Sequence, residues 1–348
     1  MEWSRWCTSK SLSNGLGSSG GASAPYKLLA KHDIQPCGKP WAFSYDLLRK
    51  MIKDILLLRN LYIVCAILPL CCYPAHSSFA GEVLISAIQY RAVPSDKISN
   101  IKALKKMISE AAGHGVQLVV LPEMSTTGLN IQSVQHASLV AESIPGPTTE
   151  KFAALAKNYN IYIIMGLLEV DLRQNKYYNS QIILGPQGII EGKYRKRNLY
   201  GLDYNWAATG DLGYKAIQTK FGKVGLGICY DINSQDLFDF FYQKRVDIFA
   251  FSTNWIGGEI PYSYWLNILN NKKIFFIAAN NWGSEGSNFS GGSIIVSPNM
   301  EILVQSANKN DGILIAKIEI TKEPWIVYLK GLEPFHRYTI SSSSLESF

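Results

Sequence analysis

Between residues 81 and 320, short runs of apolar residues alternate with stretches in which apolar residues recur every three or four positions. Residues 83–90 and 116–123 are continuous apolar runs, which favour buried strands. Between them, apolar residues at helical spacing over 98–111 predict an amphipathic helix. This order of strand, helix and strand indicates an α/β domain.

The same alternation continues to residue 320, and nothing in it resembles a linker. Further strands are expected at residues 161–170, 178–184, 188–196, 223–228, 246–252, 274–279, 292–296, 302–305 and 313–320. Further helices are expected from residue 148, from residue 233 and over residues 263–271. We therefore predict one α/β domain over residues 81–322. The tail, residues 323–348, has no clear pattern, and one interpretation places it at a subunit interface.

Two segments of different composition precede this domain. Residues 1–50 include a stretch rich in serine and glycine without periodicity, which predicts a disordered or non-native leader. Residues 51–80 carry basic Lys53 and Arg59, then an apolar run over 61–73 and small residues, which is the order of a secretory signal peptide. The apolar run is too short for a comfortable transmembrane helix, so we expect no stable membrane span in the mature protein.

The signal peptide requires translation to start at Met51. The protein would then be secreted or periplasmic, and otherwise it would be cytoplasmic. The apolar run has two alternative interpretations, an uncleaved membrane anchor and an ordinary hydrophobic helix.

The formal net charge of +7 does not describe the domain. Residues 1–80 hold nine of the 34 basic residues and four of the 27 acidic residues, which leaves 25 basic and 23 acidic residues in the remainder. Binding to a nucleic-acid backbone requires clustered positive charge, so we predict no nucleic-acid partner.

Cysteine and histidine are scarce in the domain. Only Cys229 lies in it, because the other five cysteines precede residue 81, namely Cys7, Cys37, Cys65, Cys71 and Cys72. The domain therefore cannot form an internal disulfide or a cysteine-based zinc site, and its histidines show no ligand spacing. Gly222, Gly225 and Gly227 lie before or within a predicted strand, which does not fit a phosphate-binding turn. We predict neither a metal nor a cofactor.

Three side chains with useful chemistry stand at the ends of predicted strands, Glu123, Lys196 and Cys229. Ligands of α/β sheets bind at the carboxyl ends of strands, so these positions favour a common site. Cys229 is expected at a turn from strand to helix, where free backbone amides would stabilise a thiolate. Each residue alone also has an ordinary interpretation, because a cysteine is commonly a buried small hydrophobe and a strand-terminal glutamate is commonly a surface group.

Lys196 stands within a basic run that includes Lys193, Arg195 and Arg197. Runs of like charge are commonly exposed to water. We interpret Lys193, Arg195 and Arg197 as a solvated face.

Three segments occur in a specific order along the chain. They are Leu121-Pro122-Glu123-Met124, Lys193-Tyr194-Arg195-Lys196-Arg197-Asn198-Leu199 and Gly227-Ile228-Cys229-Tyr230-Asp231. Together with Gly291-Gly292-Ser293 before Pro298, and Asn254-Trp255, they resemble the nitrilase superfamily of carbon–nitrogen hydrolases. The resemblance covers residues 82–320.

The resemblance implies a four-layer αββα sandwich, which in this family commonly pairs into homodimers or higher homo-oligomers. It also implies a catalytic triad of Glu123, Lys196 and Cys229. In the implied mechanism, the Cys229 thiolate attacks an amide carbonyl, while the Lys196 ammonium and the Tyr230 backbone amide stabilise the oxyanion. Glu123 would transfer the protons.

The chain departs from the family pattern at two positions. The family often has a histidine two residues after the lysine, where this chain has Asn198. Many members also have a second glutamate between the lysine and the cysteine, where this chain offers Asp203 and Asn205. We expect Asp203 to orient Lys196, because it keeps a carboxylate, with Asn205 as the alternative.

The residues after the nucleophile indicate the substrate class. Tyr230-Asp231 is closer to the amidase and carbamoyl-amide branches than to nitrile-hydrolysing members, so we predict a small linear amide or carbamoyl amide as the substrate. The expected pocket residues are Tyr204, Trp206, Tyr230, Asn254, Trp255 and Trp282. Nitrile hydrolysis, acyl transfer and a catalytically silent binding or assembly protein are the alternatives.

Overall fold

The computed structural model describes residues 49, 50, 53, 81–306 and 308–320, and the backbone of 340–341. The chain divides into two units, Met1–Ala75 and His76–Phe348. In the first unit, the described residues are three exposed helical ones, Arg49, Lys50 and Lys53. Apart from these three, the predicted leader and signal peptide lie outside the described residues, and so does most of the tail.

The first of two large sheets has seven strands in the order β15-β14-β1-β2-β3-β4-β5. β1 pairs in parallel with β2 and β2 with β3, whereas the remaining pairs are antiparallel. The strands are β1 (Gly81–Gln89), β2 (Leu118–Val120), β3 (Tyr162–Asp171), β4 (Lys176–Leu184), β5 (Ile190–Arg195), β14 (Gly312–Ile320) and β15 (Ile340–Ser341).

The second sheet has six strands in the order β13-β12-β9-β8-β7-β6, with β7, β8 and β9 parallel. Its strands are β6 (Lys215–Thr219), β7 (Gly222–Ile228), β8 (Ile248–Thr253), β9 (Phe275–Asn280), β12 (Ile294–Val296) and β13 (Ile302–Gln305). A separate two-stranded hairpin follows β9 and consists of β10 (Trp282–Ser284) and β11 (Asn288–Ser290).

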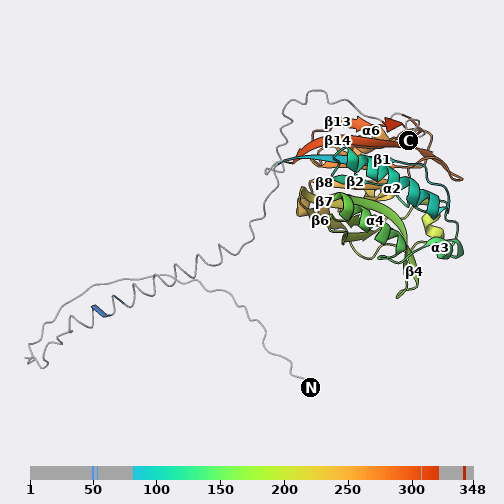
Figure 1. Ribbon diagram of the computed structural model, residues 1–348, viewed down its shortest axis with the longest axis horizontal. Helices are drawn as coiled ribbons and strands as arrows, with labels where there is room; N and C mark the ends of the chain where they lie inside the picture. The colour runs from blue at the N-terminus through green and yellow to red at the C-terminus, as the bar shows by residue number, and fades with distance from the viewer. Residues whose placement is uncertain (1–48, 51–52, 54–80, 307, 321–339, 342–348) are drawn as a thin grey trace, which may run out of the picture. The chain divides into compact units, whose positions relative to one another are not determined.

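Helices cover the outer face of each sheet (Figure 1). α2 (Lys97–Gly113) and α4 (Pro147–Tyr159) bury Leu104 and Phe152 against the first sheet. α5 (Gln235–Lys244) and α6 (Tyr262–Leu269) bury Phe241 and Trp265 against the second. The result is the four-layer αββα sandwich implied by the sequence resemblance.

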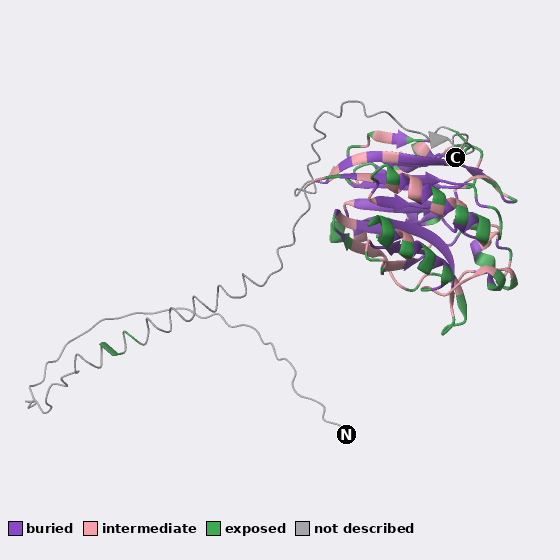
Figure 2. Cartoon of the chain, viewed as in Figure 1, coloured by how far each residue is buried: buried purple, intermediate pink, exposed green. Residues whose placement is uncertain are grey.

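The inner faces of the two sheets pack against each other, so their strands are buried almost throughout (Figure 2). Ile85 and Val120 of the first sheet and Leu226 and Ala250 of the second lie in one apolar cluster. Burial of each such aliphatic side chain contributes roughly 1.5–3 kcal/mol. This inner core fixes the ends of β2, β5 and β7 relative to one another. Glu123, Lys196 and Cys229 follow these three strand ends.

The periodicity predicts most elements to within a few residues, and the differences have local causes. The strand predicted over 116–123 is confined to Leu118–Val120, since Pro122 has no amide hydrogen to continue the ladder. β6 and the hairpin β10–β11 are too short and too polar to give a clear apolar pattern. The same holds for α3 (Val134–Val140), of which only Ala137 is buried.

The interpretation of the basic run as a solvated face is wrong for Arg195. Its guanidinium is 3% exposed and donates to Glu169 Oε1 at 2.6 Å, to Asp171 Oδ2 at 2.8 Å and to Asp211 Oδ1 at 2.9 Å. Lys193 pairs with the same Glu169 at 2.6 Å. Three carboxylates therefore compensate the burial of this cation, and the cluster ties β3 to β5 and to the loop after β5.

Truncation of Arg195 should cost far more stability than truncation of a neighbouring arginine. Arg195→Met leaves the buried Glu169 carboxylate without its bidentate partner, and we expect a loss of about 3 kcal/mol in the free energy of unfolding. Arg197→Met is the matched control, because Arg197 lies over the Tyr214 ring and has no ion pair with any residue that the structure describes, and its expected cost is below about 1 kcal/mol. Urea denaturation of the two variants measures both values, and equal losses would contradict the structural role of Arg195.

Candidate active site

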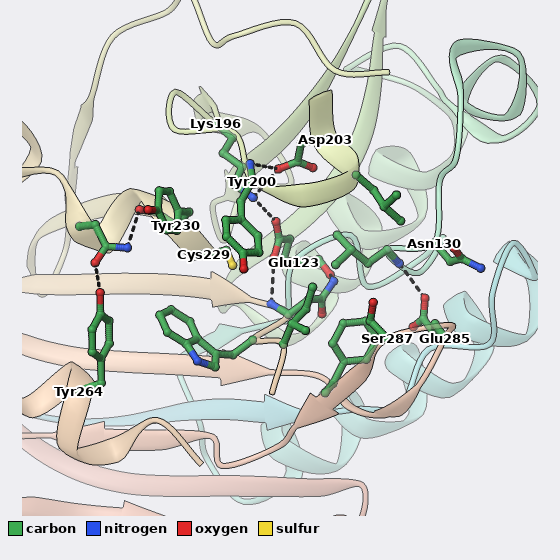
Figure 3. A pocket seen from close by; sticks show the side chains of 17 residues that line it. Glu123, Asn130, Lys196, Tyr200, Asp203, Cys229, Tyr230, Tyr264, Glu285 and Ser287 are labelled. Atoms are coloured by element: carbon green, nitrogen blue, oxygen red, sulfur yellow. Dashed lines mark hydrogen bonds and ion pairs between the residues drawn. The ribbon is translucent and has the colours of Figure 1, made fainter. Parts of the chain in front are cut away.

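Three strand ends converge on one pocket (Figure 3). Glu123 follows β2, Lys196 follows β5, and Cys229 follows β7 of the other sheet. Figure 3 shows all three side chains at the same cavity. The structure therefore brings together the three residues that the sequence singled out.

Glu123 is fixed by hydrogen bonds to both of its carboxylate oxygens. Oε1 accepts from Asn179 Nδ2 at 2.7 Å and from Lys196 Nζ at 2.9 Å, and Oε2 accepts from the Asn254 amide at 2.9 Å. A glycine in β3, Gly166, makes room for this segment, since a Cβ there would lie 2.7 Å from Glu123 Cα. The carboxylate is 1% exposed and has little freedom to move.

Lys196 lies between two carboxylates. Its ammonium donates to Glu123 Oε1 at 2.9 Å and to Asp203 Oδ2 at 2.6 Å, and the side chain is 2% exposed. Burial alone would lower the pKa of this amine, but the charges of Glu123 and Asp203 outweigh it and hold the pKa well above the ordinary value. Lys196 is therefore a permanent cation in the site.

Asp203 is held in the 3-10 helix η1 (Gly201–Asn205), where the Tyr200 amide also donates to its Oδ2 at 3.2 Å. It occupies the position expected of a residue that orients Lys196. Asn205, the alternative, is exposed and does not line the pocket.

Cys229 begins the 3-10 helix η2 (Cys229–Asn233) with a left-handed backbone, at φ +46°. This conformation is uncommon for a residue with a side chain and places the sulfur at the end of β7, at the pocket. The first amides of a helix have no partner within it, so the Tyr230 amide adjoins the thiol without an intrahelical bond.

The expectation of a stabilised thiolate does not hold for Cys229. Burial, and next the charge of Glu123, raise the pKa of the Cys229 thiol to about 12, although Lys196 acts in the opposite direction. Among the described residues, no hydrogen bond joins the sulfur to Glu123 or Lys196, whose own bonds go elsewhere. Cys229 is therefore a neutral thiol near pH 7, coupled to Glu123 and Lys196 through charge.

A buried carboxylate supports the turn that carries Cys229. Asp231 accepts from the Ile228 amide at 3.0 Å, from Tyr194 Oη at 2.8 Å and from the Asn198 amide at 2.9 Å. Burial raises the pKa of Asp231 to about 6. Asn198, at the position where the family often has histidine, thus ties the loop after Lys196 to the cysteine turn.

The pocket has a volume of about 130 Å³. Two of its aromatic side chains, Tyr200 and Tyr230, stack with ring centroids 5.0 Å apart. Its lining consists of Glu123, Leu129, Asn130, Lys196, Tyr200, Leu202, Asp203, Cys229, Tyr230, Asn233, Asn254, Trp255, Ile256, Tyr264, Glu285, Ser287 and Phe289. It can admit a small ligand to the thiol, the ammonium and the carboxylate together.

Residues 84–323 match the family model described as carbon-nitrogen hydrolase. The chain belongs to the carbon–nitrogen hydrolase family. The similarity in sequence to a nitrilase places this hydrolase in the nitrilase superfamily.

Two relatives illustrate the similarity in sequence. The hydrolase is 33% identical to a nitrilase of Pyrococcus abyssi over 223 residues, which cover 64% of this chain and 84% of the relative. It is 31% identical to omega-amidase NIT2 of Xenopus tropicalis over 176 residues, 48% of this chain and 62% of the relative. The chain thus spans less than two thirds of that omega-amidase.

Two solved structures share the fold. An amidase of Nesterenkonia sp. superposes with a TM-score of 0.61 at 18% identity, over 71% of this chain and 94% of the amidase. Nit3 of Saccharomyces cerevisiae superposes with a TM-score of 0.63 at 21% identity, over 68% of this chain and 90% of Nit3. At these identities the likeness concerns the αββα fold alone.

The part of the hydrolase that the structure describes contains no helix long and apolar enough to cross a membrane. Within the same residues, no group of three or more histidine, cysteine or acidic side chains is arranged to hold a metal ion. The homo-oligomer and the cellular location stay predictions.

Of the expected pocket residues, Tyr230, Asn254 and Trp255 line the pocket of this hydrolase. The other three aromatic residues lie elsewhere. Tyr204 is exposed, Trp206 packs in a separate apolar cluster, and Trp282 donates to Asp311 Oδ1 at 2.6 Å. Aromatic character alone does not distinguish a pocket position from a core position.

The sequence does not predict several residues that line the pocket or contact Glu123. Asn179 is an ordinary inward-facing position of β4, and nothing in the sequence marks it as a partner of Glu123. Glu285 belongs to the unpredicted hairpin. Tyr200 directly follows Leu199, the last residue of the second motif, so its closeness to Lys196 in the sequence is the one available signal.

The raised pKa of Cys229 predicts how the thiol reacts with iodoacetamide. Because the thiolate is the nucleophile, the alkylation rate should rise about tenfold per pH unit between pH 7 and 10. Glu123→Gln removes the carboxylate charge that opposes the thiolate, so the pKa of Cys229 should fall and alkylation at pH 8 should accelerate. Peptide mass spectrometry measures the rates.

Glu150→Gln is the control for this experiment, because Glu150 is an exposed residue of α4. In this variant, Cys229 should be alkylated at the same rate as in the unmodified protein. Slower alkylation of Glu123→Gln, or a rate independent of pH, would contradict the electrostatic coupling.

Proposed function

We propose that this hydrolase cleaves the carbon–nitrogen bond of a small linear amide or carbamoyl amide through a thioester on Cys229. The observation that carries the proposal is the buried Lys196 ammonium, fixed by Glu123 and Asp203 in the pocket that Cys229 also lines. A cysteine in a pocket becomes a nucleophile when a base and a cation are at hand. Here Glu123 is the base and Lys196 is the cation.

The first half-reaction forms the thioester. Glu123 takes the proton of the Cys229 thiol as the sulfur attacks the carbonyl carbon, and the carbonyl oxygen becomes an oxyanion. The Lys196 ammonium and the Tyr230 amide stabilise that oxyanion. Glu123 then gives its proton to the departing nitrogen, so ammonia or an amine leaves as the carbon–nitrogen bond breaks.

The second half-reaction restores the thiol. Glu123 accepts a proton from water as the water oxygen attacks the thioester carbonyl. The carbon–sulfur bond breaks, the acid product leaves, and the sulfur regains a proton from Glu123. Neither half-reaction needs a metal or a redox cofactor, since every proton is taken and returned by Glu123.

The neutral ground state of Cys229 fits this sequence of steps. Beside a charged Glu123 the thiolate would be a second negative charge, and transfer of the thiol proton to Glu123 removes that repulsion. The thiolate then faces the Lys196 cation, and of the two nearby anions only the more weakly acting Asp203 keeps its charge. The nucleophile is therefore generated as Glu123 becomes neutral.

Amide hydrolysis is favoured over nitrile hydrolysis by Tyr230-Asp231 after the cysteine, which resembles the amidase branches. The Nesterenkonia amidase, a neighbour in fold, is reported with covalent addition of the acetamide moiety of fluoroacetamide at its active site cysteine. Nitrile hydrolysis is the second candidate, because the relative at 33% identity is named a nitrilase.

Ammonia release from a series of linear amides and their matched nitriles tests the proposal. We expect turnover of amides, with a loss of about a thousandfold or more in kcat for Cys229→Ala. Ser138→Ala, an exposed change on α3, is the control and should keep full activity. Amide turnover that survives Cys229→Ala would refute the proposal, and turnover of nitriles alone would favour the second candidate.

Asp203 and Asn205, which lie in the same 3-10 helix η1, provide a matched pair of variants. Asp203→Asn removes one of the two anions that hold Lys196, so kcat for the amide should fall about a hundredfold, while KM changes less. Asn205→Ala alters an exposed residue of the same 3-10 helix and should change neither constant. Asp203→Glu should retain more activity than Asp203→Asn, and equal losses in both would contradict an electrostatic role.

A further inference from the structure

One buried acidic residue of the pocket takes no part in the reaction above. Glu285 lies between β10 and β11, is 6% exposed, and lines the same pocket as Cys229. In the view of Figure 3, Glu285 and Ser287 lie on one side of the cavity, and Tyr230 and Tyr264 on the other. Glu285 is therefore placed to meet the end of a substrate remote from the cleaved bond.

The Glu285 carboxylate is rigidly held. Oε2 accepts from the Leu129 amide at 2.8 Å, and Oε1 accepts from Asn281 Nδ2 at 3.0 Å. The chain at Gly128 approaches so closely that a Cβ there would lie 2.4 Å from Oε2. A carboxylate has about four acceptor positions. The Leu129 amide and Asn281 fill two of them, and the Asn130 backbone amide also acts on the carboxylate, which still leaves acceptor capacity for a ligand.

The charges of the pocket lining are unbalanced. Three of the lining residues are acidic, Glu123, Asp203 and Glu285, and Lys196 is the one basic residue among them. Lys196 is already shared between Glu123 and Asp203. The described lining thus offers no spare cation to a carboxylate of a substrate.

Burial raises the pKa of the Glu285 carboxyl group, and the charge of Arg91, a residue outside the pocket, only weakly opposes that shift. Arg91 is exposed and lies over the Trp282 ring at 5.4 Å. It neither lines the pocket nor forms an ion pair with Glu285 within the described residues. The Glu285 carboxylate is accordingly left without a direct counter-charge.

Apolar side chains account for much of the remaining lining, among them Leu129, Ile256 and Phe289. Such surfaces favour the hydrocarbon part of a ligand. A ligand that matches both features has an amide at one end, a short hydrocarbon chain, and a positive group at the other end.

On the basis of the proposed amide hydrolysis, we propose that Glu285 selects substrates whose acyl chain ends in a cationic group, such as an ammonium. The cation would donate to the free acceptor positions of Glu285 while the amide carbonyl reaches Cys229. A terminal carboxylate would instead meet a buried like charge and be rejected. Glu285 is in this sense a specificity-determining residue and does not act on the reacting atoms.

Burial of Glu285 raises the pKa of its carboxyl group. An incoming cation compensates that burial, which strengthens the contact compared with the same pair in water.

Three amides of equal chain length test the proposal, namely 5-aminopentanamide, pentanamide and glutaramic acid. We expect the unmodified protein to turn over the ammonium-bearing amide with a kcat/KM at least about tenfold above that of the carboxylate-bearing one. Glu285→Gln should reduce the preference for 5-aminopentanamide over pentanamide by about tenfold. This ratio is taken within one preparation, so it does not depend on the fraction of folded protein.

Glu259→Gln is the matched control, because it removes the same charge from an exposed residue that does not line the pocket. The preference of this variant for 5-aminopentanamide over pentanamide should equal that of the unmodified protein. A preference for glutaramic acid, or a ratio unchanged in Glu285→Gln, would overturn the role of Glu285.

Failure of the proposed reaction is distinguishable from failure of this inference. If pentanamide is hydrolysed without an ammonium preference, the inference alone fails. If none of the amides is hydrolysed, protection of Cys229 from iodoacetamide by 5-aminopentanamide and by glutaramic acid still measures selectivity in the unmodified protein, because both keep the amide at the reacting end. Stronger protection by 5-aminopentanamide supports the role of Glu285, and stronger protection by glutaramic acid overturns it.

Discussion

The site depends on one buried ammonium group. Lys196 is surrounded by protein, and a lone cation in such a place would lose its proton or disrupt the fold. Glu123 and Asp203 make its burial tolerable, at 2.9 and 2.6 Å. Their positions are set by the end of β2 and by η1, so the packing of the two sheets determines whether the charge is compensated.

This arrangement also controls the thiol. Cys229 stands at the end of a strand in the other sheet, in a left-handed conformation that the Asp231 hydrogen bonds help to maintain. Burial, and next the charge of Glu123, keep the Cys229 thiol neutral, whereas Lys196 favours the charged state that follows proton transfer. In the proposed mechanism, the carboxylate that opposes the thiolate at rest also accepts the thiol proton when a substrate is present. The strain and the burial at Cys229 are consistent with a site organised for the reaction more than for stability.

The sequence predicts the fold well because both sheets are buried between layers, which leaves continuous apolar strands and helices with one apolar face. Glu123, Lys196 and Cys229 are recognisable because each directly follows such a strand. The surroundings are harder to predict. The burial of Arg195 depends on Glu169, Asp171 and Asp211, which local charge patterns do not connect with it. Glu285 lies in a hairpin without periodicity, and its place in the pocket follows from contacts with residues about 150 positions earlier, such as the Leu129 amide.

The most direct test of the account is the mass of the peptide that contains Cys229 after rapid acid quenching of the protein with a turned-over amide. The account predicts a mass increase equal to the acyl group of that amide, located on Cys229 and decaying as the acid product appears. Formation of the acid product with no adduct on Cys229, or with an adduct on a different residue, would contradict the claim that the buried Glu123, Lys196 and Asp203 cluster serves a cysteine nucleophile.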